Sequence, residues 1–183
     1  MSTNETLDIV YDIPDEKPAE ERHILAVLVD NEFGTLNRVV GLFSSRGYNI
    51  ESLTVAEVDT KKKLSRITIV THGSRLKIQH IMALLERMVP VHKVHALTMM
   101  GPFVERELAL VKVVGTGEAR GEALRIADIF RAKPVDTSID SFVFEITGPT
   151  DKVNSFIDLM RPLGLEEVCR TGVSSVARGK KSL

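Results

Sequence analysis

Residues 71–88 read THGSRLKIQHIMALLERM, and residues 147–163 follow the same plan as TGPTDKVNSFIDLMRPL. In both segments an extended run ends at a glycine, and a hydroxyl residue then precedes an apolar stripe with helical spacing. Ser74 and Thr150 are the expected helix caps, because a side-chain oxygen at a helix start accepts from free backbone N–H groups. The recurrence of strand, glycine, cap and helix indicates a domain that occurs twice in the chain.

The segments around residues 71–88 complete one βαββαβ unit. The run HILAVLV at 23–29 is apolar on both alternating faces, which is typical of a central strand. Gly47 stands where a left-handed residue commonly ends a helix, and the charged turn DTKKK at 59–63 joins two extended runs into a hairpin. The expected elements are a strand at 23–29, a helix at 35–46, strands at 49–58 and 64–73, a helix after Ser74 and a strand at 91–99.

The second half of the chain repeats this order. The expected fold class is therefore α+β, with two tandem ferredoxin-like βαββαβ sandwiches, each a four-stranded sheet with two helices on one face. We assign residues 22–101 to the first domain and 102–177 to the second, between a mobile acidic tail at 1–21 and a basic tail at 178–183. The expected elements of the second domain are strands at 108–115, 134–139 and 141–148, helices at 118–131 and after Thr150, and an extended end at 165–177.

Composition excludes several classes of function. The 183 residues are 43% hydrophobic and 27% charged, and the formal net charge of -1 provides no basic field for nucleic acid. No run of eighteen apolar residues is present to cross a bilayer. The single Cys169 cannot form an internal disulfide, and the acidic start is unlike a signal peptide. We expect a cytoplasmic protein with neither nucleic acid nor membrane as a partner.

Other sites known on this fold find little support in the sequence. Aromatic residues are only 5% of the chain, and no motif of the RNA-binding type is present. Arg38 lies a turn inside its helix, too far along to hold a phosphate at the helix start. His92 and His95 fall on opposite faces of a strand, which disfavours a metal site, and Cys169 is expected to be a small packing residue. With no pair of nucleophile and base, we expect neither a catalytic nor a metal-binding residue, and no enzyme activity in this chain.

The loop NEFGTL at 31–36 is the strongest candidate for binding. The first backbone N–H groups of the helix that follows have no partner within it, and with the helix dipole they suit a carboxylate. Gly34 has no Cβ to block a ligand, and the Asn31 amide has donor and acceptor atoms for an amino-acid zwitterion. From spacing alone a second interpretation stays open, in which Asn31 and Gly34 only shape a turn.

A family resemblance favours the binding interpretation. The run ILAVLVDNEFGTLNRVVGLFSSRGYNIESLTV at 24–55 resembles the N-terminal ACT domain of the small, regulatory subunit of acetolactate synthase. VERELALVKV at 104–113 and RTGVSSVARG at 170–179 resemble the start and end of that family's second domain, so the resemblance spans about 22–179. It implies a feedback sensor for valine, or for leucine or isoleucine. It also implies a large catalytic subunit as partner, which carries thiamine diphosphate, magnesium and FAD, while this chain carries no cofactor.

The resemblance also assigns residues to the effector site. By motif, the ligand loop is formed by Asn31, Glu32, Phe33, Gly34, Thr35 and Leu36, with Asn49 and Ile50 as the second contributor. Two such domains pair edge to edge in the family, so Asn49 and Ile50 are expected from the other protomer of a homodimer. Phe33 departs from the small residue or proline often found there, which leaves the preferred branched-chain amino acid open. The alternative function is a free-standing amino-acid-sensing ACT module that regulates another enzyme or a transcription factor.

Overall fold

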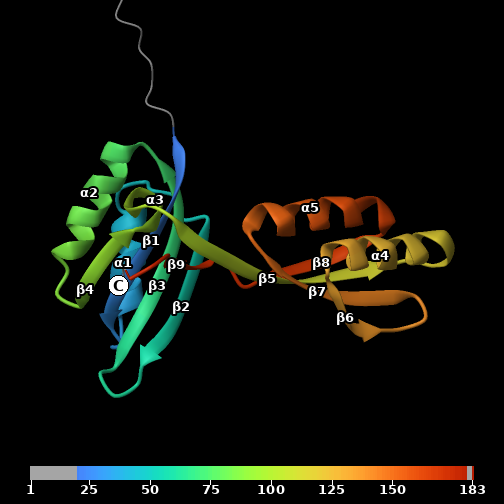
Figure 1. Ribbon diagram of the computed structural model, residues 1–183. Helices are drawn as coiled ribbons and strands as arrows, with labels where there is room; N and C mark the ends of the chain where they lie inside the picture. Colours follow the sequence, from blue (N-terminus) through green and yellow to red (C-terminus); the bar gives the residue numbers. More distant parts are fainter. Residues whose placement is uncertain (1–19, 181–182) are drawn as a thin grey trace, which may run out of the picture.

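The computed structural model describes residues 20–180 and 183. Two sheets that carry helices follow one another along the chain, and the long strand β5 (Phe103–Val114) runs from the first toward the second (Figure 1). Residues 1–19 of the expected acidic tail and 181–182 of the basic tail lie outside the described residues. The sequence also places Glu21 in the tail, whereas it is the first residue of strand β1 (Glu21–Asp30).

The first sheet has the expected βαββαβ order. Its antiparallel strands lie in the order β2-β3-β1-β4, so β1 is central and β2 is an edge strand. Helices α1 and α2 cover one face, where Val27, Phe43 and Ile81 are fully buried. The elements after β1 are α1 (Thr35–Ser44), β2 (Ser52–Asp59), β3 (Leu64–Gly73), α2 (Arg75–Glu86) and β4 (Val91–Ala96).

The other face of the first sheet is buried as well. Ile24 and Val70 on this face pack against Val173, and all three side chains are at most 3% exposed. The cover is formed by helix α3 (Leu97–Met100), strand β9 (Ser174–Ala177) and the start of β5. This two-sided burial explains why β1 is apolar on both of its faces.

The predicted strands at 91–99 and 165–177 are among those that are wrong in extent. The expected strand at 91–99 ends at Ala96, because the chain turns into α3 to cover the sheet. The expected extended end at 165–177 is two strands, β8 (Leu165–Arg170) and β9, which pair with different parts of β5. The break between them lies at Gly172, whose φ of 80° interrupts the extended backbone.

The second sheet repeats the architecture of the first. Its strands lie in the order β6-β7-β5-β8, and helices α4 and α5 cover one face, where Val111, Phe144 and Phe156 are fully buried. Strand β5 begins at residue 103 instead of the expected 108, because its first four residues pair with β9. The remaining elements are α4 (Gly117–Phe130), β6 (Lys133–Thr137), β7 (Ser141–Gly148), α5 (Thr150–Met160) and the short helix η1 (Arg161–Leu163).

The two predicted hydroxyl caps have different outcomes. Ser74 caps α2 as expected, since its Oγ accepts from the backbone N–H of Lys77 at 3.4 Å. Thr150 is not a cap: Pro149 precedes α5, and Thr150 is the first helical residue. Its Oγ1 instead accepts from the guanidinium of Arg22, 128 residues away in the chain. The hydroxyl therefore joins the two halves of the molecule.

Candidate functional site

The loop at 31–36 joins β1 to α1 and leaves part of its backbone open. Asn31 donates its backbone N–H to the carbonyl of Lys63 at 2.7 Å, which fixes the loop against the β2–β3 hairpin. Gly34 has a φ of 83°, in the left-handed region that favours glycine. A Cβ added at Gly34 would meet no atom within 4 Å. A ligand could therefore approach this backbone closely.

Helix α1 begins without a side-chain cap and without an acidic residue in its first turn. The backbone N–H groups of Leu36 and Asn37 have no acceptor in the part of the chain that the structure describes. These free donors and the helix dipole together favour a negatively charged group at this end of α1. The local geometry thus meets the requirements of a carboxylate site.

Side chains of the loop point in different directions. Asn31, Glu32 and Phe33 are exposed, and the Phe33 ring is fully exposed, so in one chain it neither narrows nor covers a pocket. Thr35 is 5% exposed and belongs to the protein interior, while Leu36 is about one-third exposed at 38%.

Asn49 and Ile50 lie far from this loop in the same chain. They lie just before Glu51, which precedes β2 and donates its backbone N–H to the Val70 carbonyl near one end of β3. Asn31 is bonded to Lys63 beyond the other end, and the seven-residue separation from 63 to 70 corresponds to about 23 Å of strand. One protomer therefore does not bring the two groups of predicted site residues together.

The second sheet has a related helix start with different chemistry. Gly117 at the beginning of α4 has a φ of 60°, as Gly34 has a positive φ before α1. However, Glu118 occupies the first turn of α4. Its carboxylate takes the position that favours an anion, so this helix start is poorly suited to bind a second one.

The remaining sequence candidates form no chemical centre. Among residues 20–180 and 183, no three His, Cys, Asp or Glu side chains are grouped as metal ligands. His92 instead bonds Asp30, at 2.6 Å. Cys169 is exposed on β8, so the prediction that it packs in the interior is wrong; β8 is an edge strand of the second sheet. In the described ranges, no helix is both long and apolar enough to cross a bilayer.

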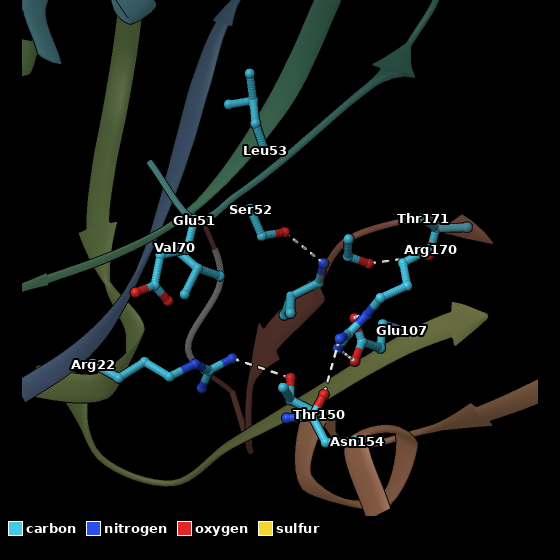
Figure 2. A pocket seen from close by; sticks show the side chains of 12 residues that line it. Arg22, Glu51, Ser52, Leu53, Val70, Glu107, Thr150, Asn154, Arg170 and Thr171 are labelled. Carbon is cyan, nitrogen blue, oxygen red and sulfur yellow. Dashed lines mark hydrogen bonds and ion pairs between the residues drawn. The ribbon is translucent and has the colours of Figure 1, made fainter. Parts of the chain in front are cut away.

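A polar cavity of about 490 Å³ lies where the two sheets meet. Figure 2 shows Arg22 reaching into it from β1 and Thr150 and Asn154 facing it from α5, with Ser52 of β2 on the opposite wall. The Ser52 Oγ accepts from the backbone N–H of Val173 at 3.0 Å, so the edge strand β2 is held to the segment between β8 and β9. Sequence reasoning missed this cavity.

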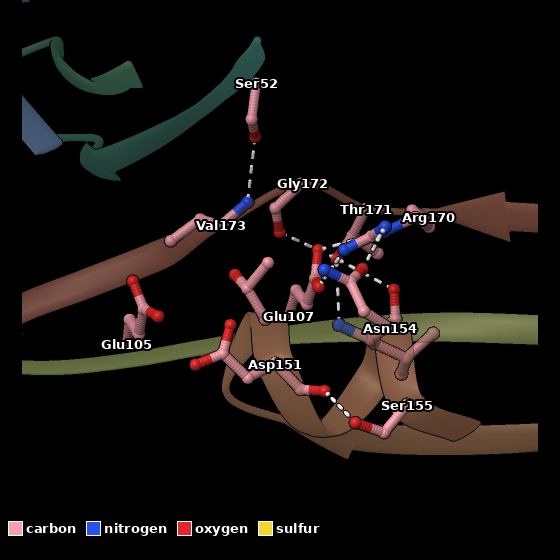
Figure 3. Close-up of polar contacts among 12 residues, drawn as sticks. Ser52, Glu105, Glu107, Asp151, Asn154, Ser155, Arg170, Thr171, Gly172 and Val173 are labelled. Atoms are coloured by element: carbon pink, nitrogen blue, oxygen red, sulfur yellow. Dashed lines mark hydrogen bonds and ion pairs between the residues drawn. The ribbon is translucent and has the colours of Figure 1, made fainter. Parts of the chain in front are cut away.

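A buried carboxylate supports one side of the cavity. Glu107 is 4% exposed and is paired with Arg170, which also donates to the Asn154 Oδ1 at 2.9 Å (Figure 3). Burial of a carboxylate is unfavourable unless it is paired and hydrogen-bonded, and Arg170 supplies both its partners. The sequence signal for this pair is an acidic residue at the start of the apolar run LALVKVV at 108–114.

Comparison with known proteins decides the family. Residues 106–179 match the model of the small subunit of acetolactate synthase, and residues 25–93 match the model of the AHAS small subunit-like ACT domain. The chain belongs to the acetolactate synthase small-subunit family. A probable acetolactate synthase small subunit from Archaeoglobus fulgidus is 46% identical over 160 residues, which cover 87% of this chain and 99% of that protein.

Two further members of the acetolactate synthase small-subunit family give the same result. The small subunit of acetolactate synthase isozyme 3 from Escherichia coli is 42% identical over 161 residues, covering 87% of this chain and 98% of that one. The crystal structure of the small subunit from Thermotoga maritima superimposes with a TM-score of 0.80 at 36% identity, covering 88% of this chain and 99% of that chain. The predicted family and the predicted fold class are both confirmed.

Proposed function

We propose that this chain is the regulatory subunit of an acetolactate synthase and binds valine, or a related branched-chain amino acid, as a feedback effector. The observation that carries the proposal is the open start of α1, where Gly34 is left-handed and the backbone N–H groups of Leu36 and Asn37 have no acceptor among the described residues. In this proposal those donors hold the α-carboxylate, and the side-chain amide of Asn31 forms hydrogen bonds with the charged groups of the zwitterion.

The effector site is completed by a second copy of the chain. Strand β2 is an edge of its sheet, and Val55 and Val58 on it are 42% and 54% exposed. If β2 pairs antiparallel with β2 of a second copy about a two-fold axis, the start of the partner strand comes to the end of the sheet that carries loop 31–36. Asn49 and Ile50 of one protomer would then lie toward Asn31 and Gly34 of the other.

A site divided between protomers provides a physical route to regulation. An effector shifts a conformational equilibrium only by its difference in affinity between two states. Because the two halves of this site lie on different chains, its affinity depends on how the dimer is arranged. We propose that the large catalytic subunit, with its thiamine diphosphate, magnesium and FAD, is sensitive to this arrangement. This chain itself makes no acetolactate.

The test is acetolactate formation by the complex reconstituted with the large subunit, measured against valine concentration. Asn31→Ala should retain activation and shift the valine midpoint upward by one to two decades, since loss of a hydrogen bond to a charged ligand costs about 1 to 3 kcal/mol. Asn37→Ala is the matched control, because Asn37 is exposed on the same helix and its backbone N–H is kept. An unchanged midpoint in Asn31→Ala would exclude this loop as the effector site. Failure of the chain to copurify with a large subunit would instead favour a free-standing sensing module.

A further inference from the structure

The cavity between the two sheets has the size and lining of a ligand site. Its volume of about 490 Å³ falls within the usual range for small-molecule pockets, about 300 to 1,000 Å³. Its lining comes from both halves of the molecule, with β1 and β2 on one side and α5 and the segment 170–173 on the other. It lies beside the start of β2, at the end of the first sheet opposite to loop 31–36.

The hydrogen-bonding groups that remain free in the cavity are mainly donors. Arg22 uses one N–H on Glu105, at 2.9 Å, and one on Thr150, at 3.3 Å, and the other three of its five have no side-chain partner among residues 20–180 and 183. The Thr150 hydroxyl accepts that bond, and its own hydrogen has no acceptor in the same part of the chain. The Asn154 oxygen accepts from Arg170, and the Asn154 NH₂ group has no acceptor within the described ranges.

These donors converge from two elements. Thr150 and Asn154 are one helical turn apart at the start of α5, so they share a face, and Figure 2 shows Arg22 approaching that face from β1. A guanidinium, a hydroxyl and an amide that face one space match the two oxygens of a carboxylate, which together accept about four hydrogen bonds. The paired Glu107 does not oppose such a ligand, because both of its oxygens are already bound by Arg170.

The opposite wall has different chemistry. Leu53 is partly buried and offers apolar surface for a short aliphatic chain, whereas Val70 and Val173 line the same wall with at most 3% of their surface exposed. Glu51 also lines the cavity; one of its carboxylate oxygens is bonded to His72, and the other has no partner among the residues that the structure describes. Its second oxygen could accept from an ammonium group.

We propose that this cavity is a second binding site, distinct from loop 31–36, for a small aliphatic carboxylate of the α-amino or 2-oxo acid class. The carboxylate is held by Arg22, Thr150 and Asn154, and the aliphatic part lies against Leu53, next to Val70 and Val173. Because the lining joins both sheets, an occupied site links the start of β2 to the second half of the chain.

The experiment is a titration of the full chain carrying Asn31→Ala, which weakens the proposed effector loop, with L-valine and separately with 2-oxoisovalerate. Methyl NMR of Val70 and Val173 detects binding near the cavity, and calorimetry measures its affinity. Because Asn49 of the divided effector site also lies near Val70, the Thr150 variants are needed to assign the binding to the cavity. We expect at least one probe to shift both methyl signals. Addition of Thr150→Val should weaken that binding by about tenfold or more, and Thr150→Ser should restore it. Ser155→Ala is the control, because the Ser155 hydroxyl is on the same helix but bonds Asp151 outside the cavity.

The two probes distinguish the source of the carboxylate. If valine binds and Glu51→Gln weakens that binding, the ligand is an amino acid. If 2-oxoisovalerate binds and Glu51→Gln leaves its affinity unchanged, the ligand is a 2-oxo acid. The proposal is overturned if neither probe moves the Val70 and Val173 methyl signals in the Asn31→Ala chain or in the unmodified chain. It is equally overturned if Thr150→Val, with its fold confirmed by a melting curve, binds as tightly as Thr150. Neither result bears on the effector loop, whose own test is the valine response of Asn31→Ala.

Discussion

Gly34 and Gly41 provide a residue-scale test of the start of α1. Gly34 has a φ of 83° and Gly41 lies in the helix interior, while an added Cβ at either position meets no atom within 4 Å. Gly34→Ala should therefore lower the free energy of unfolding by about 1 to 2 kcal/mol through backbone strain alone. Gly41→Ala should raise it by up to about 1 kcal/mol, because alanine is the better helix former. Denaturant melts of both variants check the opposite signs, and equal effects would contradict the left-handed turn.

Gly172 tests the contact between β2 and the second half of the chain. A Cβ at this position would lie 2.7 Å from the Ser52 Oγ and 2.9 Å from the Thr54 Oγ1, and φ is 80°. Gly179 has a φ of 77° with no atom within 4 Å, so it carries the same strain without the clash. Gly172→Ala should lower the melting temperature clearly more than Gly179→Ala does. Similar melting temperatures for the two variants would show that β2 is not in close contact with the backbone at Gly172.

At the scale of elements, a buried ion pair between Glu107 and Arg170 joins β5 to β8 in addition to their backbone pairing. The Glu107 side chain is 2% exposed, whereas that of Arg170 is 35% exposed and can turn toward water. Glu107→Ala should therefore cost about 2 kcal/mol of unfolding free energy, less than the loss from a fully buried pair. Asp158→Ala, which removes the exposed pair with Arg161, should cost less than about 1 kcal/mol. Denaturant unfolding measures both values, and a cost for Glu107→Ala as small as that for Asp158→Ala would rule out a structural role for the pair.

Local sequence patterns predicted most elements of this fold, and the misses have a common cause. The apolar stripes of α1, α2 and α5 and the glycine after α1 depend on near neighbours, so they are visible in the sequence. The early start of β5 and the split of 165–177 depend on pairing between residues 103–106 and 174–177, about seventy positions apart. No local pattern encodes such pairing.

The loop at 31–36 and the cavity between the sheets differ in the same respect: the first depends on local sequence and the second on long-range contacts. The glycine turn at 31–36 was predictable because a glycine next to a helix pattern is a local signal, whereas the role of this loop as an effector site stays a prediction. The cavity was not predictable, because Arg22, Thr150 and Arg170 come together only after the chain has folded back on itself. The wrong cap assignment of Thr150 belongs with this second group, since its hydroxyl is engaged by Arg22 instead of by its own helix.

At the scale of the whole molecule, the two halves are not independent. Ile24, Ala26 and Val70 are buried beneath α3, β9 and the start of β5. A chain that ends at residue 102 keeps α3 but loses β9 and the start of β5, so part of this apolar face would be exposed and could promote association or aggregation. We expect this truncated chain to melt at a lower temperature than the full chain and to associate on size-exclusion chromatography. A monodisperse truncated chain with an unchanged melting temperature would contradict this account of the core.

The central claim is an effector site divided between two protomers, and mixing two defective chains tests it most directly. In a heterodimer of Asn31→Ala with Asn49→Ala, one site carries both changes and the other carries neither. Coexpressed or exchanged chains should therefore regain tight valine binding in about one quarter of all sites, as measured by calorimetry, although each variant alone binds weakly. Binding that stays weak in the mixture, with heterodimers shown to be present, would contradict the account. It would mean that Asn31 and Asn49 of one protomer act together in one site, or that they belong to two unrelated sites.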